Sequence, residues 1–336
     1  MSDIGTPAGG RTVLAVDAGN SKIDVALVTE EGRVLARGRG GPFQPQSAGV
    51  AAAVDALDEA VRRALGEHGP PSRPYADHVA AYCAGADLPV EEEALRRELL
   101  ARGYAPGVVV GNDTFALLRA GASGPWGVAV VCGAGINAVG VSPTGAVARF
   151  PALGALSGDW GGGLTLGREA LWHAVRAEDG RGPATALAGA VTDCFGARTV
   201  EEVVLALHFG EVPMDRLNDL SPWVFRVAAG GDATAVALVL RLAEEVTLFA
   251  EVAMRRLDLL DTPTEVVLGG GVLAAADPLL IGRIGELLAL RAPQAKPLIT
   301  GTPPIVGAAL LGLDHLGAGE KAAEAVRAAL SPGDRP

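Results

Sequence analysis

Two stretches of this sequence follow the same plan, and their repetition limits the possible folds more than any other feature. Residues 15–38 read AVDAGNSKIDVALVTEEGRVLARG, and residues 129–150 read AVVCGAGINAVGVSPTGAVARF. Each stretch begins as an apolar strand, passes through a turn of small residues, continues as an alternating strand and returns through a polar turn to a third strand. The repetition predicts two related halves.

The segments after each copy predict an α/β fold. Apolar residues recur at helical spacing over residues 47–69, residues 78–86 favour a buried strand, residues 90–103 a helix, and residues 107–121 a strand that enters a helix at Asn112 and Asp113. The second copy leads into a glycine-dense loop at residues 154–167, helices up to residue 256, a strand at 264–272, a helix from about residue 278, a short strand near residue 298 and a helix at 304–313. We expect one half at residues 1–117 and the other, with a helical insertion, at 118–311, while a last helix at 312–330 packs back on the first half.

Charge and cysteine usage exclude several classes of protein. A net charge of −11 gives no basic surface for nucleic acid. The three cysteines are too few and too scattered for a disulfide framework or a Cys-rich metal site, so we expect a reducing compartment. The N-terminus has no signal-peptide core, and no apolar run of about 18 residues could cross a membrane. The sequence therefore predicts a cytoplasmic protein without membrane contact.

The turns of the two copies have the composition of phosphate-binding loops. Consecutive backbone N–H groups in a turn of small residues point into one concavity and bind phosphate oxygens. Asp17, at the end of the first strand, is a hard oxygen ligand suited to a hydrated Mg²⁺, and Ser21 and Lys22 can contact phosphate. The alternative is an ordinary hairpin, because Gly and Asn are usual turn residues.

Two further segments could carry chemistry or have a simple structural role. Asp113 follows a strand and could orient an attacking hydroxyl and accept its proton, or it could cap the helix that begins there. Gly269, Gly270 and Gly271 follow a strand and precede a helix, which allows a backbone to approach a nucleotide closely or simply makes a strand-to-helix turn.

Five motifs in order give the chain a resemblance over nearly its whole length. They are VDAGNSK at residues 16–22, GND at 111–113, CGAGIN at 132–137, SGDWGGGLTLGREAL at 157–171 and VVLGGGV at 266–272. The chain resembles the actin, heat-shock chaperone and sugar kinase superfamily, and within it the BadF/BadG/BcrA/BcrD-type ATPase group that contains N-acetylglucosamine kinase. The resemblance implies two actin-like (ribonuclease H-like) domains with a nucleotide and sugar cleft between them, and an ATP-dependent sugar kinase; a homodimer is one arrangement that it leaves open.

Residue roles follow from the same resemblance. It implies that Asp113 is the catalytic base and that Asp17 holds Mg²⁺ through water. It implies phosphate or ATP contacts for Asp17, Gly19, Asn20, Ser21, Lys22, Gly133, Ala134, Gly135, Gly269, Gly270 and Gly271. Sugar contacts are implied for Asn112, Asn137, Gly158, Asp159, Gln44 and Trp160, and the Gln44 correspondence is the weakest.

Some positions depart from the family pattern. The first turn has Ala18, Asn20 and Ser21 where Gly, Gly and Thr are usual, and the second turn lacks both usual hydroxyls at Ala134 and Ile136. In the sugar loop Trp160 replaces Glu and Gly162 replaces Ser. Trp160 could stack on a sugar or belong to the core.

The resulting expectation is a kinase that transfers the γ-phosphate of MgATP to an amino sugar, with the 6-hydroxyl of N-acetylglucosamine first. Another hexose, glucosamine or N-acetylmuramic acid remains an alternative substrate, and a non-catalytic sugar or nucleotide sensor is a rival. An activator ATPase would need clustered cysteines for an iron–sulfur cluster, and a sugar-responsive repressor would need a helix-turn-helix before the first strand.

Overall fold

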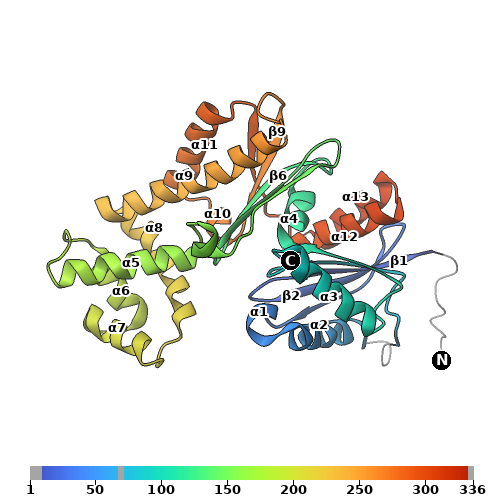
Figure 1. Ribbon diagram of the computed structural model, residues 1–336, viewed down its shortest axis with the longest axis horizontal. Helices are drawn as coiled ribbons and strands as arrows, with labels where there is room; N and C mark the ends of the chain where they lie inside the picture. The colour runs from blue at the N-terminus through green and yellow to red at the C-terminus, as the bar shows by residue number, and fades with distance from the viewer. Residues whose placement is uncertain (1–9, 67–71, 332–336) are drawn as a thin grey trace. The chain divides into compact units, whose positions relative to one another are not determined.

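Two five-stranded mixed sheets form the core of the structure, a computed structural model that describes residues 10–66 and 72–331 (Figure 1). The first sheet belongs to unit 1, which lies within Met1–Trp126 and Gly301–Pro336, and the second to unit 2, Gly127–Thr300. The first sheet contains β1 Thr12–Ala18, β2 Ile23–Thr29, β3 Val34–Gly40, β4 His78–Cys83 and β5 Gly107–Asn112. The second contains β6 Gly127–Cys132, β7 Ile136–Val141, β8 Val147–Arg149, β9 Thr264–Gly269 and β10 Ala295–Ile299.

Both sheets have the same topology. The strand order is β3-β2-β1-β4-β5 in the first and β8-β7-β6-β9-β10 in the second. In each, the first three strands form an antiparallel meander, the fourth strand pairs in parallel with the first, and the fifth pairs in parallel with the fourth. The predicted α/β class and the relation between the two halves are therefore confirmed.

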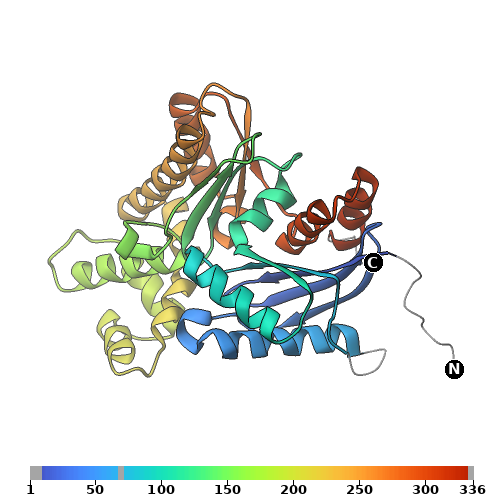
Figure 2. The same ribbon diagram turned by 45° about the vertical axis from the view of Figure 1, so that its right-hand side comes forward.

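Helices cover both faces of the first sheet, as Figures 1 and 2 show. Apolar side chains of α2 and α3 pack on one face around Leu57, Leu95 and Tyr104. On the other face α12 packs on β1 and α4, and α13 adds Val326 and Leu330 to the same cluster. The helices of unit 1 are α1 Pro45–Ala48, α2 Val50–Leu65, α3 Pro89–Ala101, α4 Asp113–Gly121, α12 Pro304–Leu316 and α13 Glu320–Leu330.

The helix expected over residues 47–69 begins later than predicted. Gly49 has φ 87° and ψ 155°, which is not helical, and it separates the short α1 from α2. Because L-residues rarely adopt this conformation, a glycine is needed at this break. Residues 67–69 of the prediction lie outside the described residues.

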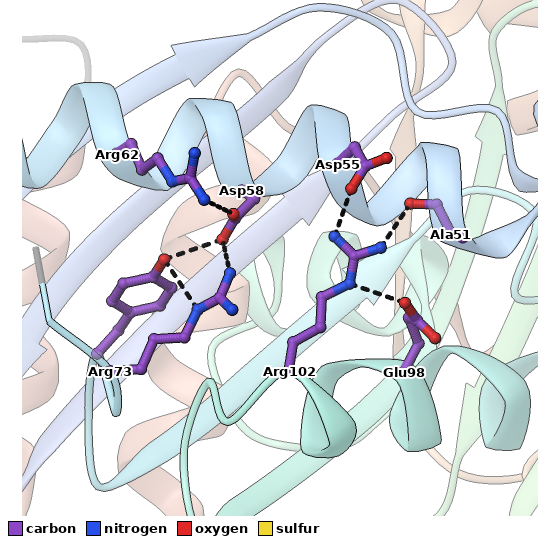
Figure 3. Close-up of polar contacts among 8 residues, drawn as sticks. Ala51, Asp55, Asp58, Arg62, Arg73, Glu98 and Arg102 are labelled. Atoms are coloured by element: carbon purple, nitrogen blue, oxygen red, sulfur yellow. Dashed lines mark hydrogen bonds and ion pairs between the residues drawn. The ribbon is translucent and has the colours of Figure 1, made fainter.

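Two arginine-centred networks join α2 to its neighbours in unit 1 (Figure 3). The buried carboxylate of Asp58 accepts from Arg73 at 2.6 Å and from the hydroxyl of Tyr75 at 2.9 Å, and it also pairs with Arg62. Arg102, which follows α3, donates to Asp55 at 2.5 Å and to the Ala51 carbonyl at 2.9 Å. These ion pairs fix α2 against the segments before β4 and after α3.

A set of helices between β8 and β9 forms the predicted insertion in unit 2. The long α9 packs on β6, β7 and β8, and α11 packs on α9. The helices of unit 2 are α5 Gly163–Glu178, α6 Leu187–Phe195, α7 Val200–His208, α8 Ser221–Ala229, α9 Ala233–Arg256, α10 Gly271–Ala274 and α11 Pro278–Arg291, with 3-10 turns at η2 Gly154–Ser157 and η3 Met214–Leu220.

Candidate active site

The first predicted phosphate turn connects β1 to β2 in unit 1. The N–H of Gly19 donates to the Lys22 carbonyl at 2.8 Å and closes the turn, while Asn20 and Ser21 are exposed at its tip. The N–H of Phe43 donates to the Gly19 carbonyl at 3.0 Å, so the loop after β3 is fixed beside this turn. Gln44 is the next residue of that loop, and its side chain is exposed. The weakest of the predicted sugar contacts is thus adjacent in space to the phosphate turn.

Asp113 lies close enough to Asp17 for its charge to affect the pKa of Asp17. Asp17 is buried at the end of β1, with 8% of its surface exposed. Burial raises the pKa of Asp17 to about 7, and the negative charges of Asp113 and Asp24 add to the effect. Unit 1 therefore brings together the predicted metal ligand and the predicted base.

Asp113 is the first residue of α4, directly after β5. Burial raises the pKa of Asp113 to about 6, although the backbone N–H groups of residues 113 and 114 favour the charged form. A carboxylate with such a pKa is ionised at neutral pH and is a much better proton acceptor than an ordinary aspartate. Its position at a strand end, beside Asp17, suits a general base.

Asn112 caps α4. Its Oδ1 accepts from the N–H of Thr114 at 3.0 Å and from the Thr114 hydroxyl at 2.6 Å, and its Nδ2 donates to Asp87 at 2.8 Å. The side chain is buried, so capping and the contact to Asp87 occupy its polar atoms. The alternative role considered for Asp113, the helix cap, is filled by Asn112, whose sugar contact stays a prediction.

The second predicted phosphate turn connects β6 to β7 in unit 2. The N–H of Gly133 donates to the Gly135 carbonyl at 2.9 Å. A β-carbon added at Gly133 or Gly135 would meet no atom within 4 Å, so both glycines border open space. That space is where a ligand could approach the backbone closely.

The start of α5 is built directly on this turn. The N–H groups of Gly163 and Leu164 donate to the carbonyls of Gly133 at 2.7 Å and Ala134 at 3.0 Å. Gly162 has φ 83°, and a β-carbon there would lie 2.4 Å from the Ala134 carbonyl oxygen. Glycine at position 162, where the family usually has Ser, is therefore required by the close approach of two backbones.

The predicted adenosine loop lies beside the same turn. Gly269 ends β9, and Gly270, with φ 86°, precedes α10. A β-carbon at Gly270 would lie 2.5 Å from the carbonyl carbon of Cys132, whereas one at Gly271 would meet nothing within 4 Å. Gly270 thus permits backbone packing, and Gly271 borders open space.

The predicted sugar loop has a defined arrangement of polar groups. The Ser157 hydroxyl donates to Asp159 Oδ2 at 2.5 Å, and the N–H of Asp159 donates to the Gly154 carbonyl at 3.0 Å. Gly158 has φ 82°, a conformation that favours glycine. Asn137 lies in β7, where its Oδ1 accepts from the N–H of Ala138 at 2.7 Å.

Trp160 is held by residues from two helices. Its indole N–H donates to Glu169 of α5 at 3.1 Å, and the guanidinium carbon of Arg241 of α9 lies 4.1 Å from its ring centroid. The ring is half-buried, so it is neither a core residue nor a free stacking surface. Glu245, also in α9, is close to this group: burial raises its pKa, Arg241 opposes the rise, and Glu244 and Asp159 contribute to it.

Sequence reasoning missed several of these polar residues. Glu169 lies within the quoted sugar-loop motif, in the helix that follows the glycines, so its position near the loop could have been inferred from the sequence. Ser157 also stands in that motif, two residues before Asp159. Nothing local marks the remaining four, because their contacts depend on strand register or on the packing of α9. The missed residues are Asp24, Arg39, Ser157, Glu169, Arg241 and Glu245.

A dedicated metal cluster is absent from residues 10–66 and 72–331, where no three His, Cys, Asp or Glu side chains come together to hold an ion. Asp17 fits a Mg²⁺ ion that keeps most of its waters, because such an ion needs only one or two carboxylates plus substrate phosphates. Over the same ranges no helix is long and apolar enough to cross a membrane.

Comparisons with known proteins agree with this architecture. The chain is 24% identical to an N-acetylmuramic acid/N-acetylglucosamine kinase of Clostridium acetobutylicum over 89% of this chain and 97% of the relative. It is 25% identical to an N-acetyl-D-glucosamine kinase of Dictyostelium discoideum, over 90% and 97%. A crystal structure of a candidate N-acetylglucosamine kinase from Chromobacterium violaceum superposes with a TM-score of 0.71 at 23% identity, over 90% and 98% of the two chains.

A family model also matches most of the chain. The family model described as "BadF/BadG/BcrA/BcrD ATPase family" matches residues 14–312, which include both sheets and every quoted motif. The resemblance stated from five short motifs is confirmed, and the chain belongs to the BadF/BadG/BcrA/BcrD ATPase family.

Proposed function

We propose that this chain is an ATP-dependent sugar kinase whose acceptor is an amino sugar, with N-acetylglucosamine first. Its relatives over about nine-tenths of the chain are named as kinases of N-acetylglucosamine, and one of them also of N-acetylmuramic acid. The single observation in the structure that carries the chemistry is the placement of Asp17 and Asp113 at the carboxyl ends of β1 and β5, parallel strands of one sheet with β4 between them. Asp113 suits proton abstraction from a hydroxyl, and Asp17 suits a metal that accompanies ATP.

Asp113 has the proposed role of general base. In phosphoryl transfer the protein mainly positions the reactants and stabilises charge, and a carboxylate orients the attacking hydroxyl and takes its proton. Because burial raises its pKa to about 6, Asp113 is ionised at neutral pH and basic enough to accept that proton. The 6-hydroxyl of the sugar is the proposed nucleophile.

Each turn offers backbone groups as proposed phosphate contacts. The N–H groups of Gly19 and Gly133 close their own turns. The proposed donors are therefore the N–H groups of Asn20 and Ser21 in the first turn and of Ala134 in the second, and Lys22 supplies a positive charge. Asp17 would hold Mg²⁺ through water. When bound, Mg²⁺ would neutralise charge that develops on the phosphate oxygens. Gly271 borders open space in which an adenosine could approach the backbone.

The proposed sugar contacts lie in unit 2, except for Asn112 and Gln44, which lie in unit 1. Asp159 and Asn137 offer carboxylate and amide groups that satisfy several hydroxyls with directional hydrogen bonds. Trp160, fixed by Glu169 and Arg241, would limit the space for a sugar substituent. Gln44 belongs to unit 1 and stays the least supported contact. Assembly as a homodimer and a cytoplasmic location stay expectations, the latter supported by the free thiols of all three cysteines.

A panel of sugars tests this function. ADP release from MgATP is measured with N-acetylglucosamine, N-acetylmuramic acid, glucosamine, N-acetylmannosamine and glucose, and with no sugar as the blank. We expect the fastest turnover with N-acetylglucosamine and little in the blank. Equal turnover in the blank would instead favour an activator ATPase, and no turnover with any sugar would favour a non-catalytic sensor.

A further inference from the structure

A row of three charged side chains crosses the first sheet next to the turn Gly19 to Lys22. In the register of the sheet, Asp17 of β1 is opposite Asp24 of β2, and Asp24 is opposite Arg39 of β3. Residues directly opposite in antiparallel strands lie on the same face, and like charges in that arrangement destabilise a sheet. Two aspartates side by side therefore require a compensating interaction.

Asp24 receives this compensation from two cations. Its Oδ1 accepts from Arg39 Nε at 2.6 Å and its Oδ2 from Arg39 Nη2 at 3.3 Å, while Lys22 Nζ donates to Oδ2 at 2.6 Å. Asp24 is only 8% exposed, whereas the side chains of Lys22 and Arg39 are 46% and 66% exposed. Burial opposes ionisation of Asp24, but the hydrogen bonds from Arg39 and Lys22 prevail and hold its pKa below the ordinary value.

The contact with Lys22 differs from an ordinary cross-strand ion pair. Lys22 belongs to the turn and not to a strand, and it is close enough to Asp17 to oppose the rise of that residue's pKa. Lys22 thus has two anionic neighbours, Asp24, which it contacts, and Asp17, whose pKa it lowers. A Lys22–Asp17 pair would remove a carboxylate from the metal and a cation from the phosphate at once.

We propose that Asp24 is a positioning residue of the nucleotide site, which holds the Lys22 ammonium at the phosphate turn and keeps it off Asp17, and that Arg39 fixes Asp24 in turn. An ammonium has three donors, so Lys22 can keep its bond to Asp24 while it donates to phosphate. Arg39 keeps the buried carboxylate compensated when Lys22 shares its charge with the ligand. The inference depends on the proposed function in one respect, which is that Lys22 binds a phosphate group of the nucleotide.

Nucleotide affinity, measured without turnover, tests this role. Isothermal titration gives the Kd of MgATP for the wild type, Asp24→Asn, Lys22→Ala and the double variant. Asn keeps the size of Asp24 but removes its charge. We expect Asp24→Asn to weaken binding about tenfold, and the double variant to bind no more weakly than Lys22→Ala alone, because the two residues act as one unit. Arg39→Ala should weaken binding in the same direction.

Asp58→Asn is the matched control, because Asp58 is also buried in unit 1 and bridges two arginines away from the turn (Figure 3). It should lower the melting temperature and leave the Kd of MgATP within about twofold. The proposal is overturned if Asp24→Asn, like Asp58→Asn, leaves the Kd of MgATP within about twofold of the wild type. It is also overturned if Asp24→Asn weakens MgATP binding as much in the Lys22→Ala variant as in the wild type. A chain that binds MgATP as expected but phosphorylates no sugar would contradict the proposed function alone, and a wild type that binds no MgATP would contradict both.

Discussion

Asn112 caps helix α4 through its contact with the N–H of Thr114 at 3.0 Å, and so leaves the carboxylate of Asp113 available for chemistry. Neighbouring residues at the end of β5 thus divide a structural role and a chemical role between them. The two roles can be separated by substitution, since one residue mainly stabilises the helix and the other mainly serves the reaction.

Asp113→Asn should abolish most of the activity without unfolding the protein. The amide has nearly the shape of the carboxylate but cannot accept the proton, so kcat should fall by roughly 10²–10⁴-fold. Asn112→Ala should instead lower stability by about 1 kcal/mol or more through loss of the cap. Steady-state kinetics and thermal melts measure both effects, and near-normal turnover in Asp113→Asn would show that the base is another residue.

The pH dependence of the reaction should reflect the environment of Asp113. Burial raises its pKa to about 6, and the base works only when it is ionised. With saturating Mg²⁺, kcat/KM should therefore fall as pH drops through about 6 and level off above it. An exposed aspartate would place this limb near pH 4. If kcat/KM instead falls only near pH 4, Asp113 is not the base.

Substitutions of two glycines, one in the second turn and one packed against it, should affect ligand binding and folding separately. Gly135→Val adds a side chain where a β-carbon meets no atom within 4 Å, so the variant should fold but bind MgATP poorly. Gly162→Ala places a β-carbon 2.4 Å from the Ala134 carbonyl oxygen, so it should destabilise the fold itself. Thermal melts and nucleotide titrations distinguish the two; wild-type affinity in Gly135→Val would mean that this turn is only structural.

Asp17→Asn should raise the Mg²⁺ requirement while it leaves the metal-free protein as stable or more stable. The pKa of Asp17 is raised to about 7 in the folded state, so its ionisation costs stability as pH rises through that value. Asn avoids this cost at pH 8. We expect Mg²⁺ with ATP to raise the melting temperature of the wild type more than that of the variant. Equal Mg²⁺ titrations in the two proteins would remove Asp17 from the metal site.

The repeated hairpins were predictable because their signals are local. Alternating apolar residues around turns of glycine and asparagine indicated both meanders, and the strand before Asn112 and Asp113 indicated the start of α4. The expected helix started too early because it included residues 47–49, although the first apolar residue at helical spacing is Val50, and the backbone conformation of Gly49 sets the boundary.

The compensated row in the first sheet could not be read from the sequence. Asp24 and Arg39 meet only because of the register between β2 and β3. Likewise Trp160 contacts Arg241 of α9, although the two residues are far apart in the chain. Polar contacts of this kind depend on tertiary packing, which no local pattern encodes.

The identity of the product shows whether this chain transfers phosphate to the 6-hydroxyl of a sugar. The protein is incubated with MgATP and N-acetylglucosamine, and phosphorus NMR with proton coupling identifies the carbon that carries the new phosphate. We predict one phosphate monoester, on the 6-hydroxyl, formed in step with ADP and nearly absent with Asp113→Asn. Release of ADP and inorganic phosphate without a phosphorylated sugar would contradict a sugar kinase. A product formed equally fast by Asp113→Asn would contradict Asp113 as the base.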